Sequence, residues 1–147
     1  MRILVLIICT LLTSATMAPA QDDRPIGLVK SASGEAFILR DGRRMATLPG
    51  SGLIRGDVLS TGATGTLGVI LRDDTVLSLG PSTETRIEQF VFEPAEKKLG
   101  MVLQVSRGLI SYISGRISKL SPGSVRIETP VATLGIRGTR LVARIVP

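Results

Sequence analysis

Short stretches of alternating apolar and polar residues recur along most of this chain. In one of them, Val125 and Ile127 are apolar, whereas Arg126 and Glu128 are charged. A period of two residues places the apolar side chains on one face of an extended strand. No stretch keeps a helical period over several turns, so the pattern predicts β-strands. The clearest alternating stretches are residues 66–72, 101–106, 124–128 and 140–145.

Turn-forming residues separate these stretches at a spacing of about ten residues, which is typical of all-β domains. Asp41-Gly42 suits a two-residue hairpin turn, because glycine adopts positive φ without a Cβ clash. Further turns are expected at residues 72–75, 80–82 and 121–123. Many short strands joined in this way predict an all-β fold, a single antiparallel sandwich or roll. No linker divides the sequence, so one domain is expected over residues 21–147.

Residues 1–20 have the composition of an export signal. Met1-Arg2 supplies a positive charge, residues 3–12 are almost entirely apolar, and Ala18-Pro19-Ala20 ends the segment with small residues. This order predicts a secretory signal peptide that is cleaved after Ala20. The apolar run is shorter than the ~20 residues of a membrane-spanning helix, and an uncleaved N-terminal anchor is the alternative. We therefore expect a periplasmic or secreted protein.

The composition excludes several kinds of chemistry. The 147 residues include no histidine and a single cysteine, Cys9, which lies within the signal segment. Nucleophiles activated by histidine and metal sites built on histidine are therefore excluded. No third carboxylate accompanies Asp73-Asp74, which we interpret as a hairpin turn rather than half of a Ca²⁺ site. We expect a protein that is not an enzyme and that needs no cofactor or metal.

The chain is basic, with 18 Lys+Arg against 12 Asp+Glu and a formal net charge of +6. Such an excess favours anionic partners, although a solvated basic surface would give the same count. Export takes the protein away from nucleic acid, so we expect no nucleic-acid partner. Anionic polysaccharide or a membrane surface would be accessible outside the cytoplasm.

Two segments stand out from this background of strands and turns. In the first, Asp57 and Thr61 can bond local backbone N–H groups in a turn. In the second, Pro130 cannot donate to a strand ladder and marks an edge or a break. Two glycines flank Arg137 where the alternation changes phase, as at a bulge or a corner. The candidate residues of both segments are Gly56, Asp57, Thr61, Gly62, Thr129, Pro130, Gly135, Arg137, Gly138 and Thr139.

Together the two segments resemble the FecR domain. The first is similar to its Gly-Asp-x-Leu-x-Thr-Gly stretch, and the second to its Thr-Pro-x-Ala-x-x-Gly-x-Arg-Gly-Thr ending. The resemblance extends over about residues 56–142. It implies an all-β, extracytoplasmic and non-enzymatic module. From the residues themselves we expect the motif positions to be structural. For Arg137, a hydrogen bond that fixes the strand end and contact with an anion are both open.

Two functions are compatible with these features. The first is an interaction or sensory module of the bacterial cell envelope, which binds another protein, with an exposed sheet edge as one route. The second is a structural or adhesive module that contacts anionic polysaccharide or a membrane surface through an Arg-rich face. Salt separates the two, because contact with an anionic polymer weakens as salt screens it.

Overall fold

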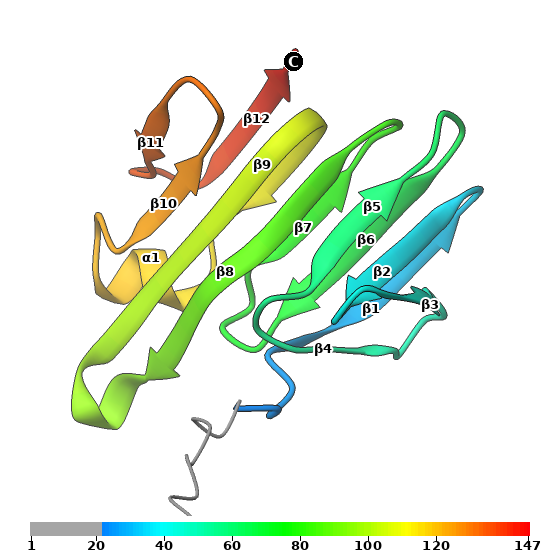
Figure 1. Cartoon of the computed structure of the whole chain (residues 1–147). Coiled ribbons are helices and arrows are strands. Elements are labelled where there is room, and N and C mark those ends of the chain that lie inside the picture. Colours follow the sequence, from blue (N-terminus) through cyan, green and yellow to red (C-terminus); the bar gives the residue numbers. More distant parts are fainter. Residues whose placement is uncertain (1–21) are drawn as a thin grey trace, which may run out of the picture.

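A long bent strand, β9 (Lys98–Ile113), runs through the centre of the molecule (Figure 1). The computed structural model describes residues 22–147, and the signal peptide expected over residues 1–20 lies outside the described residues. The N-terminal half of β9 pairs with β8 (Glu84–Glu93), and its C-terminal half pairs with β7 (Val76–Leu79). The strand therefore belongs to two sheets, which we call sheet A and sheet B.

Sheet A contains the C-terminal half of β9, and all of its neighbouring strands are antiparallel. In spatial order its strands are β4 (Gly52–Leu53), β1 (Gly27–Ser33), β6 (Thr66–Leu71), β7, β9 and β12 (Arg140–Ile145). Sheet B contains the N-terminal half of β9. In spatial order its strands are β3 (Arg43–Ala46), β2 (Ala36–Arg40), β5 (Val58–Thr61), β8, β9, β10 (Val125–Glu128) and β11 (Thr133–Gly135).

One pair of strands departs from the antiparallel pattern. β10 runs parallel to β9, with Val125 opposite Met101 and Ile127 opposite Leu103. A parallel partner needs a crossover connection, and the segment with helix α1 (Arg116–Leu120) supplies it. The other helical element is the short 3₁₀ turn η1 (Pro94–Glu96), which joins β8 to β9.

One cluster of buried apolar side chains joins the two sheets. Many of its members lie opposite one another in successive strands, so each sheet contributes rows of side chains to the core. Full burial of one such side chain stabilises the fold by about 2 kcal/mol. The most buried rows, with exposures of 0%, are Val29, Val69, Leu77 and Tyr112 in sheet A and Ile87, Leu103 and Ile127 in sheet B.

The predicted all-β class is confirmed, with about 56% strand and 6% helix. The apolar faces predicted from the alternation at residues 66–71 and 125–128 point into the core. The hairpin turn at Asp41-Gly42 is also present, with φ of 50° and 74°, as a two-residue turn of this kind requires. Helix α1 and the parallel pairing of β10 were not expected from the sequence. No helix within residues 22–147 is long and apolar enough to cross a membrane.

Candidate functional site

The first motif holds a buried ion pair. Asp57 lies in the turn before β5, and its side chain is fully buried. Its Oδ1 accepts a hydrogen bond from Arg40 Nε at 2.8 Å, and its Oδ2 accepts one from Arg40 Nη2 at 2.8 Å. The bond to Asp57 raises the pKa of Arg40 above its ordinary value. The backbone N–H of Ile54 donates to Asp57 Oδ2 at 2.9 Å, which is the local turn bond predicted for this residue.

The Arg40–Asp57 pair lies in a groove of about 770 Å³. The groove is lined by residues of both charges, but many are already paired. Arg40 also donates to the backbone O of Gly52 at 3.0 Å, and Arg86 lies 3.8 Å from Glu88. These two ion pairs neutralise part of the groove wall, whereas Asp41 and Arg55 also line it and form no ion pair with a described residue.

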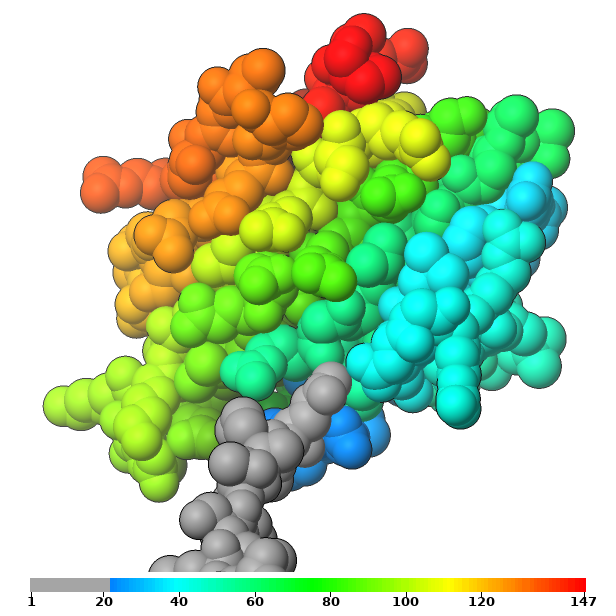
Figure 2. Space-filling view, viewed as in Figure 1, coloured from blue at the N-terminus to red at the C-terminus, as the bar shows by residue number. Residues whose placement is uncertain are grey.

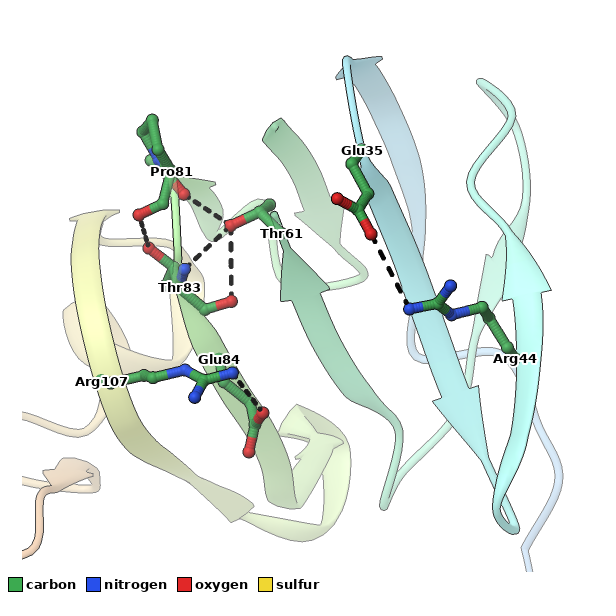
Figure 3. A network of polar contacts seen from close by, with 8 residues as sticks. Glu35, Arg44, Thr61, Pro81, Thr83, Glu84 and Arg107 are labelled. Atoms are coloured by element: carbon green, nitrogen blue, oxygen red, sulfur yellow. Dashed lines mark hydrogen bonds and ion pairs between the residues drawn. The ribbon is translucent and has the colours of Figure 1, made fainter. Parts of the chain in front are cut away.

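Thr61, the next motif residue, ties strands of the two sheets together (Figure 3). Its Oγ1 donates to the backbone O of Gly80 at 2.7 Å and accepts from the backbone N of Thr83 at 3.0 Å. Thr83 in turn accepts a hydrogen bond at Oγ1 from the backbone N of Leu109 at 2.9 Å. Gly62 continues this connection by donating its N–H to the backbone O of Glu35 at 2.8 Å. Both threonines are buried, so the first motif has a structural position in the fold.

Asp73 is a turn residue with a second task. Its carboxylate accepts hydrogen bonds from Thr75 N at 3.1 Å, Thr75 Oγ1 at 2.8 Å and Ile117 N at 3.2 Å. Its side chain therefore fixes both its own turn and the start of α1. Within residues 22–147 no group of three or more potential metal ligands is present.

The second motif begins in a tight turn between β10 and β11. Thr129 N–H donates to the backbone O of Ala132 at 2.8 Å, and Thr129 Oγ1 accepts from Ala132 N at 3.1 Å. Pro130 follows at the turn, outside the strand ladder, where its missing N–H is not needed. Gly135 pairs with Arg126 in the β10–β11 ladder and has no positive φ.

Arg137, Gly138 and Thr139 form the corner at which the chain leaves β11 in sheet B and enters β12 in sheet A. Gly138 has a φ of 133°, and a Cβ built on it would meet no atom within 4 Å. The backbone O of Thr139 accepts from Ser114 N at 2.9 Å. The corner predicted from the change of phase is therefore present.

Arg137 is exposed, and no hydrogen bond or ion pair to its guanidinium occurs within the described part of the chain. The hydrogen bond that would fix the strand end is thus not observed. The residue lines a cavity of about 500 Å³ together with Lys119 and Ser118. Arg137 is therefore an exposed motif residue whose charge is not compensated by a described residue.

The C-terminal part of the chain carries an uncompensated positive charge. None of the basic residues after Arg107 is in an ion pair with a described residue. Glu128 is the single acidic residue in residues 108–147. Figure 2 shows β10, β11 and the residues that follow, in orange to red, at one end of the visible face, away from the β2–β3 hairpin in cyan. The basic residues are Arg116, Lys119, Arg126, Arg137, Arg140 and Arg144.

Strand β12 is an open edge of sheet A at this end of the molecule. It pairs with β9, with Arg140 opposite Ile113 and Ile145 opposite Gly108, and with no other described strand. Its residues alternate between exposed and half-buried. An edge of this kind leaves unpaired N–H and C=O groups that can accept another strand. The sequence indicated an exposed edge only in general terms, because alternation does not reveal which strand lies outermost.

Comparison with known proteins gives one match. Residues 57–146 match the sequence model of the family described as FecR protein. No curated protein and no solved structure matched the chain significantly. FecR domains are extracytoplasmic, non-enzymatic domains known in envelope signalling. The match includes almost all of both motifs and more than half of the chain, and the protein therefore belongs to the FecR family.

Proposed function

We propose that this protein is a non-enzymatic interaction module of the cell envelope, located outside the cytoplasm, which binds a protein partner in signal relay. The partner adds a strand to β12. The observation that carries this proposal is the open edge of β12, which continues sheet A without a described strand beyond it. Main-chain hydrogen bonds to such an edge provide affinity for an extended segment.

The arrangement of the other motif residues supports this choice of surface. Asp57 and Thr61 are buried and hold strands together, so they are not free to contact a partner. The groove around the Arg40–Asp57 pair contains two ion pairs, and the chain has no histidine to act as a base near neutral pH. A binding role through exposed main chain needs neither a nucleophile nor a base.

A second function has its own supporting observation. The basic residues from Arg116 to Arg144 lack ion pairs with described residues, so contact with anionic polysaccharide or a membrane surface is the competing proposal. This contact would depend on charge alone and would weaken steeply with salt. Strand addition retains its main-chain hydrogen bonds at moderate salt.

A pair of proline variants tests strand addition at β12. In an antiparallel strand, neighbouring residues direct their N–H groups to opposite edges. Ser114 N–H donates to Thr139 O, so Ala143, four residues further along β12, also faces β9, whereas Val142 faces the open edge. Ala143→Pro therefore removes a hydrogen bond to β9, and Val142→Pro, the outward variant, removes an N–H that faces the open edge. Proline is tolerated at outward positions of edge strands. The outward variant should melt near the parent temperature, whereas the other should melt clearly lower.

Binding is then measured by pull-down from an envelope extract at low and at high salt. The outward variant should lose the partner that the parent captures, and the parent should retain that partner at high salt. If the outward variant melts like the parent and captures the same partner, strand addition at β12 is wrong. If the parent loses all partners at high salt, contact with an anionic polymer becomes the better explanation.

A further inference from the structure

The side chains of β12 divide into two sets by the face they present. Leu141, Ala143 and Ile145 are half-buried and pack against the core cluster. Arg140, Val142 and Arg144 are exposed on the opposite, outer face of sheet A, and Val142 is 58% exposed. A strand added beyond β12 would have side chains directly opposite each member of both sets.

The outer face of sheet A offers the two arginines no carboxylate. The strands of this sheet contain no aspartate or glutamate. Arg140, Val142 and Arg144 lie opposite Ile113, Ser111 and Leu109 on β9. Neither arginine has an ion pair with a described residue, so the one remaining lateral position for a counter-charge is on an added strand.

The other edge strands of the described chain lack this combination. β4 has two residues and β11 has three. β3 has four residues and carries Arg43 and Arg44 on opposite faces. The Arg44 guanidinium lies 3.6 Å from the centre of the Phe37 ring. It also lies 3.9 Å from Glu35, toward which it points in Figure 3. Only β12 combines six residues with two unpaired cations on one face.

We propose that β12 selects an extended segment of a partner protein with acidic residues opposite Arg140 and Arg144 and an apolar residue opposite Val142. The segment reads acid-x-apolar-x-acid on its outer face, and the intervening residues are apolar because they meet the half-buried set. This specificity rests on the proposed function, since it requires strand addition at β12. Opposite charges at cross-strand positions are favourable, and like charges are unfavourable.

The same charges disfavour pairing between two copies of the chain. In the antiparallel register centred on Val142, a second copy would place Arg140 opposite Arg144 twice. Charged residues on an edge strand protect it against self-association. The two arginines therefore repel a second copy of β12 and attract an acidic partner strand. Specificity then depends on repulsion as well as on attraction.

The test measures binding of labelled peptides to the protein by fluorescence anisotropy. Three peptides share an apolar set and differ at two outer positions, which are Glu, Thr or Lys. The parent should bind the Glu peptide about tenfold more tightly than the Lys peptide. The variant Arg140→Glu/Arg144→Glu should reverse this order. The control, Arg126→Glu on β10, changes an exposed charge in sheet B and should keep the order of the parent.

The outcomes separate the two proposals. If the three peptides bind the parent equally and the double variant changes nothing, acidic specificity is wrong while strand addition stands. If no peptide binds and the outward proline variant still captures the partner of the parent, the proposed function is wrong as well.

Dextran sulfate, an anionic polymer without a peptide backbone, serves as a competitor. If it displaces none of the peptides and the Lys peptide binds the parent best, the charge assignment is overturned. If dextran sulfate binds the parent as the Glu peptide does, and the double variant loses both, the surface recognises charge alone and the proposal fails.

Discussion

Asp57 illustrates how a residue of a short motif depends on a partner far away in sequence. The sequence predicted local backbone bonding, and the bond from Ile54 N is such a bond. Its strongest partner, however, is Arg40, which lies on β2 and forms two hydrogen bonds with the carboxylate. No spacing rule connects these residues, because β2 and β5 become neighbours only when sheet B forms.

Replacement of Asp57 by alanine should lower the free energy of unfolding by about 3 kcal/mol, because it leaves a half-buried guanidinium and the N–H of Ile54 without their acceptor. Thermal or chemical denaturation measures this loss. Glu88→Ala is the control, since Glu88 lines the same groove but is exposed, and its change should stay within about 0.5 kcal/mol. An equal effect of both variants would contradict the structural role of Asp57.

Tyr112 gives a prediction for alkaline pH. Its side chain is completely buried, its hydroxyl forms no hydrogen bond with a described residue, and burial raises its pKa. The folded-state pKa lies above the unfolded value of about 10, so the neutral phenol favours the folded state. This contribution to the free energy of unfolding is complete below about pH 10 and is lost as the pH rises through the folded-state pKa. Absorbance of the phenolate reports this residue directly, since the chain has a single tyrosine.

The variant Tyr112→Phe should melt at or above the parent temperature near neutral pH, because a buried hydroxyl without a partner is unfavourable. Its loss of stability above about pH 10 should be smaller than that of the parent. A phenol that titrates at its ordinary pKa in the folded protein would show instead that water reaches this part of the core.

At the scale of elements, alternation predicted the strands well but not their partners. The stretch over residues 101–106 was recognised as a strand, yet it is part of the much longer β9. The bend of β9 occurs near Gly108, where φ is 99°. A pattern of period two records which face of a strand is buried, and it contains no information on which sheet the strand joins. For the same reason the parallel pairing of β10 was not foreseen.

Gly108 and Gly138 should respond differently to the same substitution. Both have positive φ, so alanine at either position costs about 1–3 kcal/mol in backbone strain. A Cβ at Gly108 would also overlap the backbone and hydroxyl of Thr83, whereas at Gly138 it would meet nothing within 4 Å. Gly108→Ala should therefore have the clearly lower melting temperature. Equal melting temperatures would contradict the close contact between β9 and Thr83.

At the scale of the whole molecule, the two motifs have separate tasks. The first holds the strands of both sheets together through Asp57 and Thr61, and these residues are buried. The second leads the chain from sheet B to sheet A and places β12 on an open edge. The sequence predicted a structural role for both motifs. It could not locate the surface, because an edge strand is defined by the strands that are not beside it.

The most direct test of binding at β12 is hydrogen exchange of backbone amides, measured with and without the Glu peptide. The outward-facing N–H groups of β12 exchange readily in the free protein, because they have no described partner strand. Strand addition at β12 predicts that the peptide slows exchange at alternate residues of β12 and leaves the groove around Asp57 unchanged. Protection confined to the corner at Arg137, or to that groove, with β12 unaffected would contradict it.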